Sequence, residues 1–503
     1  MVSDPPDERA REAPAALMRT RWSPVTQRTI GSNIRRLTFV IAIAFLVTSI
    51  GVGYWSLVAA AQLNADPFNP RLIAAIRDRA RGKILAVDGR VLAESVKDGD
   101  SYRRRYADRS LAQVIGYGSA KYGAAGIEAA YQESLIGQDP SDLIGQWQAR
   151  YFGARSEPGS VVLGLDPKVQ AAAVAALGGR RGAIVALDPK TGRILASVSL
   201  PSYDANALVD PQQQDVAWQQ LNDNKDKPLI NRAAQGLYPP GSTMKIVTAA
   251  AALESGFDPN QQIRVDDPYQ ADKSWGDYFV RSAVGAHGNF DMALAFQRSE
   301  NIYFAKVGLT IGGAKLAEYA KKFGLGHAPA LDLAAAKGQI SNNGSLDRPT
   351  LVADTSYGQG QLLVSPLQMA LVAATVGNHG VQVQPHYATE IRDPSGGVLR
   401  IVGPGAGDQI ISAANAAKLT AFLVGAVEAP GAFAFGAKIT GVHVAGKTGT
   451  AETPSGSPHG WFVGFAPAED PVVAIAVIVE NAGQGGVDAA PIGAAVMRAV
   501  LGK

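Results

Sequence analysis

Apolar and polar positions divide the chain into stretches with different patterns. Residues 1–36 are rich in Pro, Arg and Ala and show no apolar period, which predicts a disordered tail. Residues 37–58 form a run without a charged side chain. A helix rises about 1.5 Å per residue, so a run of about 20 residues crosses the hydrocarbon core of a membrane. The pattern therefore predicts a transmembrane helix at 37–58.

The residues around this run indicate its orientation. Tyr54 and Trp55 near its end suit a membrane interface. Five arginines precede it: Arg19, Arg21, Arg28, Arg35 and Arg36. By the positive-inside bias we expect a single-pass plasma-membrane protein, with a cytoplasmic tail and everything after Val58 outside the cytoplasm. A cleaved signal peptide is the alternative, because residues 59–61 are alanines, but the apolar run is longer than such a peptide needs.

Residues 59–157 have the pattern of a small α+β module. Short strand-like pieces at 83–87 and 90–93 flank an Asp88-Gly89 turn, and 126–131 has a helical pattern. No set of residues here suggests catalysis. The basic run 103–105 is interpreted as a solvated patch, with a docking surface for a partner as the alternative.

Residues 158–503 combine strand and helix patterns in a definite order. Strand-like runs come first, a helical block occupies the middle, and strands with a closing helix at 492–501 come last. This order predicts an α/β (α+β) domain whose antiparallel sheet is built from both ends of the region. The predicted strands are 182–187, 193–198, 447–451, 461–465 and 472–479, and the predicted helices include 296–311, 314–323 and 366–372.

Composition excludes several classes of function. The chain has 503 residues, of which 47% are hydrophobic and 18% charged, and a formal net charge of +3. That charge is too small to indicate nucleic-acid binding. There is no cysteine, and the six histidines are scattered without a metal-binding spacing, so we expect no disulfide, no thiolate nucleophile, no metal and no cofactor.

The first candidate for catalysis is the segment 238–245. Two prolines and Gly241 predict a rigid turn, and the Ala-rich run after Lys245 predicts a helix that ends near Gly256. Ser242 and Lys245 are three residues apart and share one face of that helix start. A lysine that is kept neutral can take the proton of a serine hydroxyl and activate it as a nucleophile. Taken alone, the spacing also fits a helix cap beside a solvated lysine.

Two further segments could complete such a site. Ser299 and Asn301 lead into the helical run at 302–311, and Lys447 opens the strand that carries Thr448, Gly449 and Thr450. A serine can relay a proton, an amide can hold a peptide group, and a second lysine can keep the first one neutral. The same short patterns recur at 341–343 and 190–192, but both of those lie in predicted turns.

The three segments, in this order, resemble the motifs of penicillin-recognising serine enzymes. The N-terminal module is similar to the pedestal of class B penicillin-binding proteins. The residues that carry this wider resemblance are Arg81, Gly82, Ile84, Asp88, Gly89, Leu92, Ala93, Gly126, Glu128, Tyr131, Leu135, Gly137, Asp188, Pro189, Thr191, Gly192, Asn231–Ala233, Ser365–Gln368 and Ala489–Pro491. The chain looks most like the compact actinobacterial penicillin-binding protein A type, although the acidic Glu300 is unusual for class B.

The resemblance implies a domain plan and a fold. The plan is a tail at 1–36, a transmembrane helix at 37–58, a pedestal or dimerisation-type domain at 59–157 and a transpeptidase domain at 158–503. The implied fold is the penicillin-recognising serine transferase fold, an antiparallel sheet flanked by helices with an all-helical subdomain.

The resemblance also implies roles for residues. Ser242 would be the acylated nucleophile, Lys245 its base, Ser299 a proton shuttle and Asn301 a holder of the acyl donor. Lys447, Thr448 and Thr450 would bind the terminal carboxylate of the donor and tune Lys245, and Gly449 of the same motif would take part in substrate binding. The backbone N–H groups of Ser242 and Thr450 would form the oxyanion hole.

The implied activity is a D,D-transpeptidase that cross-links peptidoglycan stem peptides in cell-wall synthesis and division and is inhibited by β-lactams. A polytopic membrane glycosyltransferase is the partner that the resemblance implies. Two alternatives remain open at this point. One is a D,D-carboxypeptidase or β-lactamase on the same fold, and the other is a non-catalytic β-lactam sensor or division scaffold.

Overall fold

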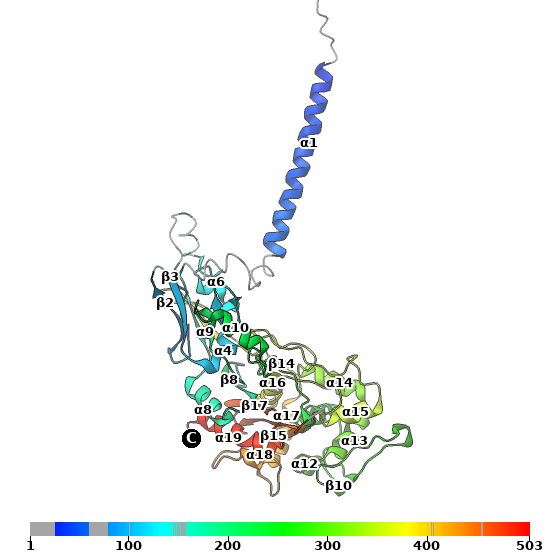
Figure 1. The fold of residues 1–503 in the computed structure, drawn as a ribbon. Coiled ribbons are helices and arrows are strands. Elements are labelled where there is room, and N and C mark those ends of the chain that lie inside the picture. The colour runs from blue at the N-terminus through cyan, green and yellow to red at the C-terminus, as the bar shows by residue number, and fades with distance from the viewer. Residues whose placement is uncertain are drawn as a thin grey trace, which may run out of the picture. The chain divides into compact units, whose positions relative to one another are not determined.

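The computed structural model describes residues 26–59, 79–99, 101–143, 157–403, 407–453 and 456–503, together with positions 145, 147, 151 and 405. The chain divides into two compact units, Met1–Asp66 and Pro67–Lys503. Among the described residues, the second unit contains two large β-sheets, three two-stranded sheets and the helices that cover them (Figure 1). Each unit is considered by itself below.

The first unit contains the apolar helix α1 (Thr26–Gly53), which continues into the π-helical turn η1 (Tyr54–Val58). Within it, residues Gly31–Ser56 are long and apolar enough to cross a membrane. The helix begins at Thr26, so the prediction of disorder is wrong for residues 26–36. Arginine and glutamine are good helix formers, and an established helix extends at little cost. Residues 1–25 of the predicted tail lie outside the described residues.

The larger core is built on a five-stranded sheet with the order β15-β16-β17-β7-β8, in which every neighbouring pair is antiparallel. Strands β7 and β8 come from the start of this region and the other three from its end, which confirms the predicted antiparallel sheet. The strands are β7 (Gly182–Leu187), β8 (Ile194–Leu200), β15 (Ala445–Ala451), β16 (His459–Ala466) and β17 (Val473–Val479).

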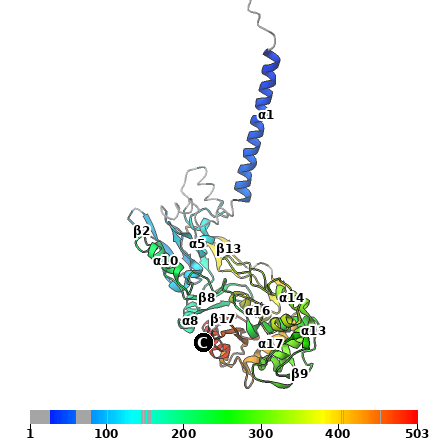
Figure 2. The same ribbon diagram turned by 45° about the vertical axis from the view of Figure 1, so that its right-hand side comes forward.

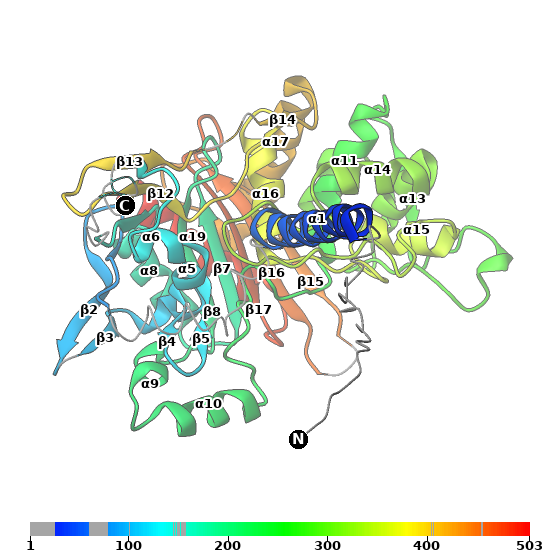
Figure 3. The ribbon, with the colours of Figure 1, turned by 90° about the horizontal axis from the view of Figure 1, so that it is seen from above.

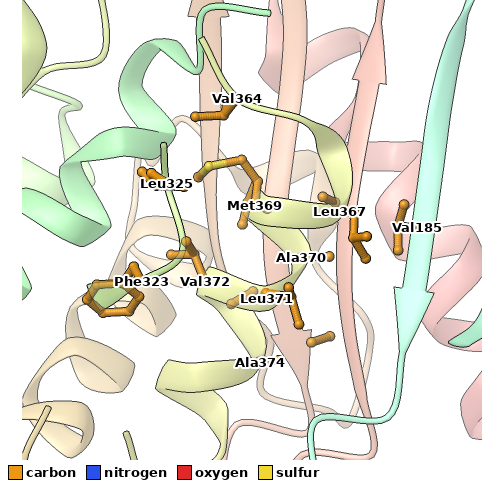
Figure 4. Close-up of a cluster of buried hydrophobic side chains, with 14 of the residues drawn as sticks. Val185, Phe323, Leu325, Val364, Leu367, Met369, Ala370, Leu371, Val372 and Ala374 are labelled. Carbon is orange, nitrogen blue, oxygen red and sulfur yellow. The ribbon is translucent and has the colours of Figure 1, made fainter. Parts of the chain in front are cut away.

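Helices cover both faces of this sheet. Alternate residues of β7 point to opposite faces, so Ile184 packs with helices α8 (Pro167–Leu177) and α19 (Ala490–Leu501), whereas Val185 packs with α16 (Pro366–Gly377). Every residue of α16 is buried. In Figure 4 its Leu367 lies toward Val185, while Phe323 and Leu325 flank the opposite side of the helix. This apolar helix therefore joins the sheet to the helical part of the molecule.

The helical part lies beyond the β15 edge of the sheet, as Figure 3 shows for α11, α13, α14 and α15. It confirms the predicted helical block between the two groups of strands. Its helices are α11 (Lys245–Glu254), α12 (Met292–Gln297), α13 (Asn301–Ile311), α14 (Gly313–Lys322), α15 (Pro349–Ser356) and α17 (Ala413–Glu428). Shorter pieces are η3 (Gly241–Met244), η4 (Lys273–Trp275), η5 (Phe435–Ala437), α18 (Gly485–Asp488), β9 (Ile263–Asp266), β10 (His287–Phe290), β11 (Val381–Gln382) and β14 (Asp408–Gln409).

A second sheet has six strands in the order β13-β12-β6-β1-β2-β3. Only the β1–β6 pair is parallel. Its strands are β1 (Ile84–Leu85), β2 (Val91–Asp98), β3 (Ser101–Tyr106), β6 (Ser160–Leu163), β12 (Ala388–Arg392) and β13 (Val398–Ile401). The late strands β12 and β13 thus join the early module, and Figure 2 shows yellow β13 beside the cyan α5.

The early module also contains short helices and a two-stranded ladder. They are η2 (Arg109–Leu111), α4 (Ala112–Ile115), α5 (Gly126–Ala130), α6 (Gln132–Leu135), β4 (Gly118–Ser119) and β5 (Gly123–Ala124). Helices α9 (Ala205–Val209) and α10 (Gln214–Asp223) from the later region lie near them, with α9 in contact with β3 and β4.

The basic run 103–105 differs from its interpretation as a solvated patch. Arg103 and Arg105 are exposed, but Arg104 is buried and contacts Glu128. Successive side chains of a strand point to opposite faces, so one of three adjacent arginines in β3 must face inward. A buried carboxylate at Glu128 makes that orientation favourable.

Candidate active site

The segment that carries Ser242 is a tight turn held against two other parts of the chain. Gly241 has φ +53°, and its N–H donates to the carbonyl of Gly358 (2.9 Å). The indole N–H of Trp461 donates to the carbonyl of Pro239 (2.9 Å). Ser242 lies in the short 3-10 helix η3, and α11 begins at Lys245. Ser242 therefore sits one turn before the α-helix rather than at its first residue.

Lys245 is fully buried, and its Nζ lies at the centre of the site. Nζ is 2.8 Å from Oγ of Ser242, 2.6 Å from the carbonyl oxygen of Ser299 and 2.7 Å from Oδ1 of Asn301. The Nδ2 group of Asn301 donates to the carbonyl of Arg281 (3.0 Å), which leaves Oδ1 facing the lysine. The predicted residues of the first two segments thus meet around one amine.

Ser299 connects this amine to a second one. Nζ of Lys447 donates to Oγ of Ser299 (2.7 Å), and the same Oγ is 3.4 Å from Nζ of Lys245. Ser299 has φ +53°, a backbone conformation that is uncommon outside glycine. This conformation lets both its carbonyl and its hydroxyl oxygen face the lysines. Non-glycine residues in this region often mark functional sites.

Burial determines the charge state of the two lysines. Burial and then the charge of Lys447 lower the pKa of Lys245 far below that of an exposed lysine, while Glu300 opposes this effect. Burial lowers the pKa of Lys447 to about 7. Two cations cannot share such a small, dry site without a large cost. The site therefore favours one proton between the two amines.

The strand that carries Lys447 packs directly against the serine turn. A side chain at Gly449 would come within 2.8 Å of the carbonyl of Pro240, and one at Gly241 within 2.7 Å of the carbonyl of Thr450. Glycine at both positions allows this close backbone approach. Thr448 is buried, and its carbonyl accepts from Nζ of Lys447 (3.0 Å), whereas Thr450 is exposed.

Glu300 has no contact with solvent. One carboxylate oxygen accepts from the N–H of Ile302 (2.9 Å) and caps α13, and the other accepts from the hydroxyl of Ser282 (2.7 Å). The sequence left open whether this acid faces water or changes the local proton balance. The structure places it inside, where it caps a helix and lies close enough to raise the pKa of Lys245.

The second copies of the two short motifs, at 190–192 and 341–343, lie outside this site. Lys190 is exposed and pairs with Asp470 (2.5 Å) at the β7–β8 turn. Ser341 bonds locally to Asn343 and Ser345. Within the described residues, no cluster of three His, Cys, Asp or Glu side chains could hold a metal ion.

Family comparisons agree with this geometry. Residues 182–498 match the family described as penicillin binding protein transpeptidase domain. Residues 81–161 match the family described as penicillin binding protein A dimerisation domain. The chain belongs to the class B penicillin-binding proteins.

Individual relatives place the chain within this family. The peptidoglycan D,D-transpeptidase PbpA of Mycolicibacterium smegmatis is 36% identical over 501 residues, 94% of this chain and 99% of that protein. The ceftriaxone acyl-enzyme complex of penicillin-binding protein A from M. tuberculosis has a TM-score of 0.79 and 34% identity, and covers 85% of this chain and 100% of that one. Pseudomonas aeruginosa PBP2 has a TM-score of 0.73 and 29% identity, covering 84% and 96%. The predicted likeness to the penicillin-binding protein A type is thus confirmed.

Some residues that build this penicillin-binding protein site were not found from the sequence. Gly358 and Trp461 hold the serine turn, and Arg281 and Ser282 orient Asn301 and Glu300. Each of these four acts through a backbone carbonyl or a single bond to a neighbour. Residue type gives little signal for such roles, which arise only when distant segments meet.

Proposed function

We propose that this chain is a membrane-anchored peptidoglycan D,D-transpeptidase that forms an acyl-enzyme through Ser242 and is acylated there by β-lactams. The observation that carries this proposal is the fully buried amine of Lys245, which lies 2.8 Å from Oγ of Ser242. Burial and the charge of Lys447 lower the pKa of this amine, which favours its neutral form. This is the arrangement that a serine nucleophile needs.

Hydrogen bonding indicates how Lys245 acts. A neutral amine has two N–H donors and one lone pair. The carbonyl of Ser299 and Oδ1 of Asn301 can only accept, so they take the two donors. The lone pair is then left for the hydroxyl of Ser242. As Oγ attacks the peptide carbonyl between two D-alanines, its proton moves to Lys245.

The departing D-alanine must gain a proton when its C–N bond breaks. Oγ of Ser299 lies between the two lysine amines and can pass a proton from them to the leaving nitrogen. Lys447 replaces the proton that Ser299 gives. The second half-reaction reverses this path, because the amine of another stem peptide gives up a proton as it attacks the ester carbonyl and frees Ser242.

The remaining residues would hold the donor. Lys447 in its charged form, with Thr448, Gly449 and Thr450 of β15, suits the terminal carboxylate. The N–H groups of Ser242 and Thr450 are the proposed oxyanion donors, supported by the contact between their segments. Asn301 is proposed to hold the donor's peptide group.

A hydrolytic function on the same fold has less support. Hydrolysis needs a base that activates water against the acyl-enzyme. Glu300 follows Ser299 in the chain, and its two carboxylate oxygens already accept hydrogen bonds from Ile302 and Ser282. Glu300 is therefore held as a helix cap and is not placed to activate water. This favours transfer of the acyl group to an amine over hydrolysis.

Orientation and partnership are also part of the proposal. Arg28, Arg35 and Arg36 precede or begin the apolar part of α1, which supports a cytoplasmic N-terminus and an extracytoplasmic catalytic domain. A polytopic membrane glycosyltransferase that makes the glycan strands is the proposed partner. With Arg104 buried, Arg103 and Arg105 are the exposed residues of the candidate docking surface. Charge reversal at both positions is expected to weaken co-purification of that partner. Unchanged association would rule out Arg103 and Arg105 as the docking surface.

Labelling with a fluorescent penicillin tests the nucleophile. We expect the full chain in detergent to be labelled and Ser242→Ala to lose the label. Ser395→Ala, an exposed serine in the β12–β13 turn, is the matched control and should keep it. Persistent labelling of the Ser242→Ala variant would show that Ser242 is not the acylated nucleophile.

A donor peptide that ends in D-Ala-D-Ala, offered with an acceptor amine, tests the reaction class. The transpeptidase proposal expects the amide product to exceed the hydrolysed donor. Predominant hydrolysis at saturating amine would identify a carboxypeptidase. Full rescue of a deletion strain by Ser242→Ala would identify a scaffold or sensor instead.

A further inference from the structure

The loop between β9 and β10, residues 267–286, orients the second catalytic segment. The carbonyl of Arg281 accepts from Nδ2 of Asn301 (3.0 Å), so Oδ1 of that amide faces Nζ of Lys245 (2.7 Å). An amide turned the other way would present its amino group to Lys245 and compete with Ser242 for the lone pair of the base. The loop therefore decides which side of the Asn301 amide meets the base.

Tyr278 ties this loop to helix α15. More than half of the loop residues are exposed, so the position of the loop depends on a few contacts with the rest of the chain. The hydroxyl of Tyr278 donates to Oδ1 of Asp354 in α15, and the hydroxyl of Tyr357 donates to the same oxygen (2.7 Å). Burial raises the pKa of Asp354, whereas both hydroxyls oppose this effect by donating to its charged form. One carboxylate oxygen therefore joins the loop to the end of α15.

The end of α15 also holds the turn that carries Ser242. Tyr357 follows the last residue of α15, and the carbonyl of the next residue, Gly358, accepts from the N–H of Gly241 (2.9 Å). A side chain at Gly358 would come within 1.9 Å of the carbonyl of Gly241, so the two backbones are in direct contact. Asp354 therefore lies between the loop that orients the amide and the turn that carries the nucleophile.

We propose that Tyr278 is a positioning residue of the transpeptidase reaction. Its bond to Asp354 fixes the Asn301 amide relative to the serine turn. A hydrogen bond to a carboxylate is stronger than one between neutral groups, and this bond joins segments that are 76 residues apart in the chain. With the bond in place, the lone pair of Lys245 stays directed at Ser242. Tyr278 acts through the amide and not on the substrate, and this inference rests on the proposed function.

The acylation rate of Tyr278→Phe tests this role. The substitution removes one hydroxyl and keeps the ring that packs against Trp275, with ring centroids 5.6 Å apart. In detergent, we expect fluorescent penicillin to acylate the full-length variant about tenfold more slowly, because the amide is no longer held in place, and to label it completely at long times. The unfolding midpoint should change by less than about 3 °C, since only one hydrogen bond is lost.

Tyr269→Phe is the matched control on the same loop. Tyr269 is half-buried, and its ring centroid lies 4.5 Å from Nζ of Lys306, a contact that phenylalanine keeps. Its hydroxyl has no hydrogen-bond partner among the described residues. This variant should be acylated at the rate of the unsubstituted chain. Equal slowing of Tyr269→Phe and Tyr278→Phe would overturn the specific role of the bond to Asp354.

A double-mutant cycle with Asn301→Ala separates positioning from a general effect on the fold. If Tyr278 acts through Asn301, adding Tyr278→Phe to Asn301→Ala should slow acylation further by less than about twofold. A further loss of about tenfold in that background would show that Tyr278 acts by another route, and it would overturn the inference.

The same labelling assay keeps this inference apart from the proposed function. Loss of the label in Ser242→Ala supports the proposed function independently of Tyr278. If the unsubstituted chain is not labelled at all, the proposed function and the positioning role both fail. If the chain is labelled through Ser242 but Tyr278→Phe is acylated at an unchanged rate, only the positioning role fails.

Discussion

The chemistry of this site depends on the protonation of two lysines that share one serine. In the proposed mechanism, Lys245 is neutral when it accepts the proton of Ser242, and Lys447 is charged when it holds a carboxylate. Burial lowers both pKa values, and the charge of Lys447 lowers that of Lys245 further. Because the pKa of Lys447 is about 7, the free enzyme begins to lose the remaining proton of this lysine pair close to neutral pH.

This coupling predicts a change in the pH profile of Lys447→Gln. Removing the charge of Lys447 raises the pKa of Lys245, so a larger fraction of Lys245 is protonated at a given pH. The acid limb of the β-lactam acylation rate should move to higher pH, and a Lys245 pKa that is one unit higher should slow acylation about tenfold on that limb. The measurement is the acylation rate constant between about pH 5 and 9. Lys190→Gln, in the exposed copy of the motif, should leave the profile unchanged.

At the scale of elements, the site is three segments that touch through their backbones. The turn before η3, the start of α13 and the strand β15 are each held by glycines or by bonds to main-chain carbonyls. Gly241 is the point at which the serine turn meets β15, and it has a positive φ. The position of Ser242 relative to the proposed oxyanion donors therefore depends on the absence of a side chain at Gly241.

Gly241→Ala is expected to slow acylation by about 100-fold, because an added Cβ would lie 2.7 Å from the carbonyl of Thr450 and push the serine turn from β15. Gly256→Ala is the control, with φ +80° but nothing within 4 Å of the new carbon. It should lower stability by about 1 kcal/mol and leave the acylation rate unchanged. If both variants were acylated at the same rate, the contact between Gly241 and β15 would not position Ser242.

The buried carboxylate of Glu128 connects α5 to β3 through Arg104 and to the segment before β1 through Arg81. Glu128→Gln leaves two guanidinium charges buried without a counter-ion, so it should destabilise the chain by about 3–5 kcal/mol. Thermal or denaturant unfolding measures this change. Glu94→Gln, which removes the partner of exposed Arg105, should cost less than about 1 kcal/mol. A similar small loss for Glu128→Gln would mean that the arginines find other acceptors.

At the scale of the second compact unit, the early module and the catalytic region share one sheet. Strands β12 and β13 follow α16 in sequence, yet β12 pairs with β6, which pairs with β1. The predicted boundary between 157 and 158 falls just before β6, and it stays a prediction for the domain plan. Elements on both sides of it pack into one hydrophobic core.

We therefore expect this unit to unfold in one cooperative transition. Ile391 of β12 is buried, so Ile391→Ala should lower a single calorimetric midpoint by the equivalent of about 2–5 kcal/mol. Ile401 of β13, on the same hairpin, is 76% exposed, and Ile401→Ala should have little effect. Two separate transitions, with only the earlier one lowered by Ile391→Ala, would contradict this shared stability.

The sequence by itself predicted the apolar helix, the strand–helix–strand order and the three motif segments, because periodicity and turn residues act locally. It also separated Lys447 from its copy at Lys190. It was wrong about residues 26–36 and about Arg104, where a neighbouring helix and a buried carboxylate override the local pattern. Only the tertiary structure brought Lys245, Ser299 and Lys447 together, joined β12 to the early module and placed Glu300 inside. These outcomes depend on contacts between residues far apart in the chain, which no local pattern encodes.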